Sequence, residues 1–205
     1  MLSRAPHRAP WRVAPWDAES PGPWTRELDG ADVVVNLAGR SVNCRYTPAN
    51  RRAIKESRVT STRVVGEAIA GAAPPPRVWL QMSTATIYAH RYDAPNDEAT
   101  GILGGAEPGA PDTWRFSIDV ATSWERALDA AATPRTRKVA LRAAVVMSPD
   151  RGGVFDLLLR LVRFGLAPEA EAHEAQQQVE HAAPVGAHHD GRAQRSEERR
   201  VGKEC

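Results

Sequence analysis

The sequence predicts an α/β protein built on a doubly wound parallel β-sheet. Short apolar runs rich in β-branched residues alternate along the chain with longer segments of helical periodicity. Strands inside a parallel sheet are typically apolar throughout, and a helix is the usual connection between two of them. Three runs stand out as strands, 32–37, 77–83 and 138–148, and a short strand is expected within 11–17.

The helix expected between the first two strong strands has the clearest boundaries. Thr47 and Pro48 are typical of an N-cap and a first helical residue, because proline lacks an amide hydrogen that the first turn leaves unpaired anyway. Three consecutive prolines end the helix near Ala72. One inward face follows from three- and four-residue steps: Ile54, Ser61, Val65, Ala68 and Ile69.

The second strong strand, 77–83, shows Val78, Leu80 and Met82 in alternation. A long Gly/Pro-rich segment, 89–112, follows it, and its length indicates a functional loop. Further helices are expected from about Phe116 to Ala132 and within 152–165. The stripe of the first of these is Ile118, Ala121, Trp124 and Leu128.

Composition changes after residue 166. The segment beyond has almost no large apolar residues, so it lacks the material of a hydrophobic core. We therefore predict one domain over residues 1–166 and a disordered tail over 167–205. The last eleven residues, RSEERRVGKEC, look like a translated sequencing adapter, and so we assign no metal-ligating role to His188, His189 or Cys205.

Bulk properties exclude several classes of function. The chain has 205 residues, 42% of them hydrophobic, and a net charge of +2, which is too small to indicate a nucleic-acid partner. It contains no apolar run near the ~20 residues that a membrane helix requires. The two cysteines, Cys44 and Cys205, show no disulfide or zinc spacing, which favours a reducing, cytoplasmic location.

Several motifs together resemble a known family. They are DVVVNLAGRSV at 32–42, RYTPANRRAIKESRVTSTRVVGEAIA at 45–70, STATIY at 83–88, DEATG at 97–101 and LRAAVVMSPDRGGVF at 141–155. In combination they are similar to the epimerase-type (NAD(P)-dependent epimerase/dehydratase), atypical extended short-chain dehydrogenases/reductases. The resemblance spans residues 1 to about 166 and implies a Rossmann-like fold with NADP(H) as cofactor.

The resemblance also implies that the sheet is incomplete. In the family a glycine-rich phosphate loop follows the first strand, whereas MLSR at the start of this chain resembles the end of the second. We therefore expect an N-terminally truncated fragment, without the first strand and its loop, that carries a foreign C-terminal tail. Such a fragment would leave 32–37 as an exposed apolar edge and would bind NADP(H) negligibly.

The cofactor-binding candidates come mainly from the resemblance. Arg4 falls where family members place an arginine for the adenosine 2′-phosphate, which favours NADP over NAD. A small-residue turn at the carboxyl end of the strand 32–37 lies where open α/β sheets bind ligands. Its glycine permits close approach of the backbone to a ribose or adenine. These turn residues are Asn36, Leu37, Ala38 and Gly39, and the remaining candidates are Arg58, Tyr88 and Arg142.

The catalytic candidates are Thr84 and its neighbour Ser83. Family members carry a hydroxyl here that holds the substrate carbonyl, although a hydroxyl at a strand end also commonly bonds the local backbone. The usual tyrosine and lysine pair of the family reads Phe116 and Val120 in this chain, and no lysine lies between Lys55 and Lys138.

Other charged residues have plainer interpretations. Asp119 and Glu125 could replace the pair, but charged residues on an amphipathic helix usually form its solvated face. Asp97 and Glu98 suit a loop cap better than a carboxylate pair.

Three hypotheses follow. The first is an NADP(H)-binding oxidoreductase or epimerase-like protein that acts on an unknown carbonyl or sugar-like small molecule. The second is a nucleotide-binding sensor or scaffold without turnover, which the absent tyrosine and lysine favour. The third is a fragment that binds nothing well.

Overall fold

The computed structural model describes residues 1–5, 7–91, 93–144, 146, 148 and 154–166. Residues Met1–Ala144 form one compact unit, and the helix α3 belongs to a second unit that we describe by itself. The predicted tail, 167–205, lies outside the described residues. None of the helices in the described part of the chain is both long and apolar enough to cross a bilayer.

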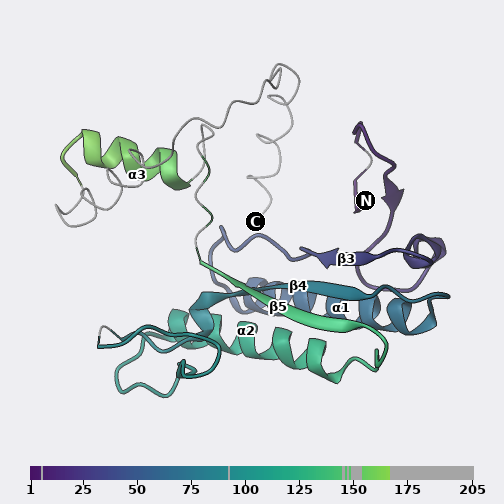
Figure 1. Cartoon of the computed structure of the whole chain (residues 1–205). Coiled ribbons are helices and arrows are strands. Elements are labelled where there is room, and N and C mark those ends of the chain that lie inside the picture. The colour runs from purple at the N-terminus through teal and green to yellow at the C-terminus, as the bar shows by residue number, and fades with distance from the viewer. Residues whose placement is uncertain (6, 92, 145, 147, 149–153, 167–205) are drawn as a thin grey trace, which may run out of the picture. The chain divides into compact units, whose positions relative to one another are not determined.

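Parallel strands confirm the predicted α/β class. A three-stranded sheet has the order β3-β4-β5, made of Val33–Asn36, Val78–Thr84 and Arg137–Ala143 (Figure 1). Register pairs Val35 with Leu80, and Leu80 with Val139. A second, two-stranded parallel sheet pairs β1, Leu2–Ser3, with β2, Ala14–Pro15.

Two helices cover one face of the three-stranded sheet, α1 (Pro48–Gly71) and α2 (Asp112–Ala130) (Figure 1). The Thr47 hydroxyl accepts a hydrogen bond from the Asn50 amide at 3.2 Å, which confirms the predicted N-cap. All residues of the two predicted inward faces are buried. A short 3₁₀ helix, η1 (Pro23–Leu28), adds Trp24 and Leu28 to the core that α1 forms with Trp79 of β4.

The buried face of β4 differs from the alternation that the sequence suggested. Trp79, Gln81 and Ser83 are buried beneath the two helices, whereas Val78, Leu80 and Met82 are only half-buried on the opposite face. Trp79 supplies more apolar surface than any of the three alternating residues, and the polar side chains of Gln81 and Ser83 find hydrogen-bond partners on this face.

Several predicted boundaries also shift. The helix expected from Phe116 begins four residues earlier, at Asp112, because Pro111 takes the N-cap position and the acidic Asp112 suits the first turn. The strand expected over 138–148 spans Arg137–Ala143. Only Ala14–Pro15 of the segment 11–17 is strand, and this pair of residues lies parallel to β1.

The remaining elements are short. A 3₁₀ turn, η2 (Ala85–Ile87), follows β4 directly. The loop after it is tied back by a bridge between Tyr88 and Leu103 and by a hydrogen bond from the Gly104 amide to the Ile87 carbonyl at 2.9 Å. In the second unit, α3 (Val154–Arg163) carries an ion pair between Asp156 and Arg160 at 2.9 Å.

Candidate functional site

A cavity of about 590 Å³ lies along β1 and β3. We call it the β1–β3 cleft. Its lining includes five of the residues predicted to contact the cofactor, namely Arg4, Asn36, Leu37, Ala38 and Gly39. Arg4 follows β1, and 36–39 close the carboxyl end of β3, so the candidates gather at the strand ends where ligands of parallel sheets bind.

Asn36 is buried and hydrogen-bonded at the end of β3, beside this cleft. The residue is only 4% exposed, its side-chain Nδ2 donates to Gln81 Oε1 at 3.0 Å, and its Oδ1 accepts from the Ala38 amide at 3.0 Å. The second bond shapes the turn that carries Leu37 and Gly39. Asn36 therefore positions the turn, and its side-chain amide is already engaged within the protein.

Arg58 lies directly against Gly39. A Cβ at Gly39 would come within 3.1 Å of Arg58 Cζ, so the glycine makes room for the guanidinium. Arg58 donates to the carbonyls of Arg40 and Ile54 at 3.1 and 2.9 Å and lies 5.2 Å over the Trp124 ring. Burial lowers the pKa of Arg58. Arg58 does not itself line the β1–β3 cleft.

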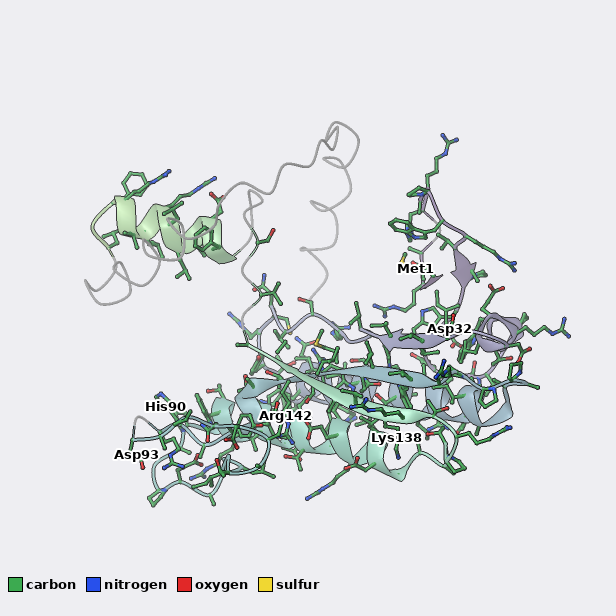
Figure 2. All side chains as sticks on the ribbon, viewed as in Figure 1. Met1, Asp32, His90, Asp93, Lys138 and Arg142 are labelled. Atoms are coloured by element: carbon green, nitrogen blue, oxygen red, sulfur yellow. The ribbon has the colours of Figure 1, made fainter. Side chains whose placement is uncertain are left out.

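A second cavity, of about 360 Å³, lies beside η2 and the loop that follows it. We call it the Tyr88 pocket. Besides Tyr88, its walls include Arg142 from β5 and the aromatic rings of His90 and Trp114, whose centroids are 5.4 Å apart. Figure 2 shows Arg142 on the side of the sheet where the loop with His90 and Asp93 lies, and Lys138 toward the other end of β5.

A hydrogen-bonded cluster joins this pocket to the sheet. Glu125 accepts from Arg142 Nε at 2.9 Å and Nη2 at 2.7 Å, and from the Ser83 hydroxyl at 2.6 Å. Arg142 Nη1 in turn donates to the Tyr88 hydroxyl oxygen at 2.7 Å. We call Ser83, Glu125, Arg142 and Tyr88 the Glu125 cluster, since the carboxylate lies at its centre.

Electrostatics favour the ionised forms of Glu125 and Arg142. The side chains of Glu125 and Arg142 are only 14% and 25% exposed. Burial raises the pKa of Glu125, but the hydrogen bonds from Arg142 and Ser83 and the charge of Arg142 outweigh it and leave that pKa below the usual value. The hydrogen bond to Glu125 likewise raises the pKa of Arg142 above its usual value.

The two hydroxyls considered for catalysis have different surroundings. Ser83 is 3% exposed and its hydroxyl is committed to Glu125. Thr84 is half-buried, and its Oγ1 accepts from the Thr86 amide at 3.2 Å and donates to Thr86 Oγ1 at 2.9 Å. Thr84 thus makes the local turn expected of a strand-end hydroxyl, and of the two it is the more accessible.

The positions that resemble the family's tyrosine and lysine are used for packing. Phe116 meets Tyr46 edge-on at a centroid distance of 5.4 Å, and Val120 is 7% exposed. Asp119 pairs with Lys55 at the surface, at 2.9 Å. Asp97 caps its loop by accepting from the Ala99 and Thr100 amides.

Glu125 was the functional candidate that we undervalued. We expected a solvated face, yet its side chain is nearly buried because it flanks Trp124 in the stripe of α2. A charged residue beside a buried stripe, together with an arginine in a neighbouring strand, was the available signal.

Comparison with known proteins identifies the family, although no family model matches the chain. The epimerase family protein SDR39U1 of Bos taurus is 30% identical over 180 residues, which cover 85% of this chain and 54% of that protein. A crystal structure of human SDR39U1, isoform 2, with NADPH matches with a TM-score of 0.62 and 26% identity, over 81% of this chain and 51% of that one. The chain belongs to the epimerase-type short-chain dehydrogenase/reductase family.

A second solved structure also matches the chain. The nucleoside-diphosphate sugar epimerase of Corynebacterium glutamicum is 30% identical in a structural match with a TM-score of 0.55, covering 78% of this chain and 31% of that one. The predicted family and Rossmann-like fold class are therefore confirmed. The chain spans about half the length of the curated relatives it matches.

Proposed function

We propose that this epimerase-family chain supplies part of an NADP(H) site in an oxidoreductase or epimerase-like protein that acts on a carbonyl or sugar-like small molecule. The observation that carries the proposal is the β1–β3 cleft, which brings Arg4 and the turn 36–39 together from segments more than thirty positions apart. Related human SDR39U1 was crystallised with NADPH, which supports the choice of cofactor.

The residues of the cleft fit the adenosine end of this cofactor. Arg4 is exposed and carries a permanent positive charge that a 2′-phosphate would attract, and the buried Asn36 fixes the adjoining turn. The cofactor, when bound, supplies a hydride carrier. From the protein's side, the Thr84 hydroxyl at the end of β4 is our candidate donor to a substrate oxygen, which would replace Thr86 Oγ1 as its acceptor.

Binding is tested by nuclear magnetic resonance, because this method also detects weak complexes. Amide spectra of the full chain are recorded during titration with 2′,5′-ADP, NADPH and NADH. We expect shifts at 36–39 with the two 2′-phosphorylated ligands, and the Arg4→Ala variant should lose about tenfold in their affinity, since hydrogen bonds to charged groups contribute roughly 1.5–3 kcal/mol.

The matched control is Arg8→Ala, which removes an exposed arginine of the same segment that does not line the cleft. It should leave the titration unchanged. Shifts that avoid 36–39, or an Arg8→Ala effect equal to that of Arg4→Ala, would contradict the proposed site. The absence of saturable shifts with every ligand would also contradict the proposed site and would favour the hypothesis of a chain that binds nothing well.

A second candidate function is nucleotide binding without turnover, as a sensor or scaffold. The packing of Phe116 and Val120 favours it, because neither side chain can transfer a proton. Single-turnover oxidation of bound NADPH over a panel of carbonyl compounds separates the two functions. Hydride transfer that is lost in Thr84→Val would exclude the function without turnover. Tight NADPH binding with no hydride transfer to any compound of the panel would favour that function.

A further inference from the structure

The Tyr88 hydroxyl has an unused hydrogen. Arginine is an obligate hydrogen-bond donor, so the contact of 2.7 Å from Arg142 Nη1 makes the phenol oxygen the acceptor. The phenol hydrogen must therefore point elsewhere. Within the described residues, no acceptor for it is found. Tyr88 also lines the cavity beside η2, where a ligand could supply that acceptor.

The phenol is held in place from three sides. Arg142 stacks over the Tyr88 ring at 4.9 Å while it holds the oxygen. Glu125 fixes the arginine through both Nε and Nη2, which leaves the guanidinium little freedom to turn. Gly101 lies so close that a Cβ there would come within 2.5 Å of the ring. Such restraint is typical of a group that must meet a ligand at a defined position.

The pocket has the size and walls of a small-molecule site. Its volume of about 360 Å³ is within the range of ligand pockets. The His90 and Trp114 rings form an aromatic wall, with their planes tilted by 36°. The two arginines of the pocket, Arg91 and Arg142, are each paired with a carboxylate, and Glu98 adds a negative charge to the lining, so the pocket does not favour an anion. An uncharged ligand with a ring and one acceptor oxygen suits these walls.

We propose that the Tyr88 pocket binds a cyclic or aromatic ketone or aldehyde, with the Tyr88 hydroxyl donating to its carbonyl oxygen and Glu125, through Arg142, as the positioning residue. That the bound carbonyl compound is a substrate rests on the proposed function. Binding itself does not require the cofactor, so the two proposals fail independently.

The experiment uses 4-(trifluoromethyl)acetophenone as the probe, with the full chain and no nucleotide. Fluorine resonances report its dissociation constant, and 1-ethyl-4-(trifluoromethyl)benzene is the matched probe without the carbonyl oxygen. We expect Tyr88→Phe to weaken ketone binding by about five- to tenfold, the value of one hydrogen bond, and to leave the ethylbenzene affinity unchanged.

Glu125→Gln tests the positioning role through the ratio of the ketone affinity to the ethylbenzene affinity. It should lower the ratio toward that of Tyr88→Phe, because the arginine loses its ionic partner, while the ethylbenzene affinity stays at the wild-type value. A merely structural role would weaken both probes together. Tyr46→Phe, which removes a hydroxyl outside this pocket, is the control and should bind both probes as wild type does.

Two results would overturn the proposal. One is wild-type affinity for the ketone in Tyr88→Phe, and the other is the absence of saturable ketone binding to the wild-type chain. Equal losses for both probes in Tyr88→Phe would likewise assign the residue a structural role only.

Discussion

At the scale of single residues, the Glu125 cluster combines ionic and hydrogen-bonding roles in a nearly buried place. Isolated charges are costly to bury, but the fork of Arg142 is satisfied by two carboxylate oxygens and a phenol. Removing one partner leaves the other charge buried and uncompensated. The stability lost in this way exceeds the net stability that the intact pair contributes. Glu125 and Arg142 are therefore both sensitive positions of the cluster.

We expect Glu125→Gln to lower the free energy of unfolding by about 1–3 kcal/mol at neutral pH, because Arg142 loses its ionic acceptor. Urea denaturation followed by circular dichroism measures the change. The control is Glu56→Gln, an exposed position on α1, which should shift stability by less than about 0.5 kcal/mol. Equal effects of the two variants would show that the contacts of Glu125 do not stabilise the fold.

The lowered pKa of Glu125 predicts that the effect of Glu125→Gln on stability depends on pH. The pKa of Glu125 is lowered in the folded protein, so its contribution to stability is complete above the usual glutamate pKa of about 4.3 and is lost as the pH falls through the folded value. The stability difference between wild type and Glu125→Gln should accordingly shrink in acid. A difference that stays constant from pH 7 to pH 3 would contradict this assignment.

Residue-level predictions from sequence were limited by unknown partners. Asn36 and Gly39 line the β1–β3 cleft. Sequence could not show that the Asn36 amide is already bound to Gln81, a residue 45 positions away, or that Arg58 fills the space beside Gly39. Both contacts depend on which strand and helix become neighbours, and no local pattern contains that information. The cofactor roles of these residues stay predictions.

At the scale of elements, local signals decided what could be predicted. The ends of α1 followed from Thr47, Pro48 and the three prolines, because capping and proline sterics act within a few residues. The start of α2 was missed because Pro111 offers no side-chain cap. The buried face of β4 was missed because tertiary packing of Trp79 beneath α1, and not alternation, determines it.

Close packing of α1 on the sheet gives a matched pair of glycine variants. A Cβ at Gly66 would come within 2.9 Å of the Ala131 Cβ and 3.3 Å of the Trp79 ring, whereas a Cβ at Gly71 meets nothing within 4 Å. We expect Gly66→Ala to destabilise by about 1–3 kcal/mol through overpacking, despite the helix propensity of alanine. Gly71→Ala should be neutral or stabilising. Thermal denaturation compares them, and a stabilised Gly66→Ala would show that the interface is looser than described.

At the scale of the whole described unit, strand order leaves β3 at an edge of its sheet, beside the β1–β3 cleft. Its residues form two separate parallel sheets, β1-β2 and β3-β4-β5, and β3 is an edge strand of the second. The predicted exposure of the strand 32–37 is confirmed, since Val33, Val35 and Leu37 are 48%, 52% and 63% exposed. The strands could be predicted from apolar runs, but their order could not, because pairing between distant segments leaves no local trace.

An exposed apolar edge strand is a template for pairing with another chain. We therefore expect concentration-dependent self-association through β3, and Val35→Lys should reduce it, because a charged side chain on an edge strand opposes the approach of a second strand. Val35 is about half exposed, so the lysine can reach solvent without disturbing the helix-covered core. Sedimentation equilibrium over a concentration series measures the weight-average mass. Ala70→Lys adds the same charge at an exposed position of α1 and should associate as wild type does. If both lysine variants reduce association equally, net charge and not the β3 edge controls it, and a wild-type chain that stays monomeric at every concentration would show that the edge does not pair.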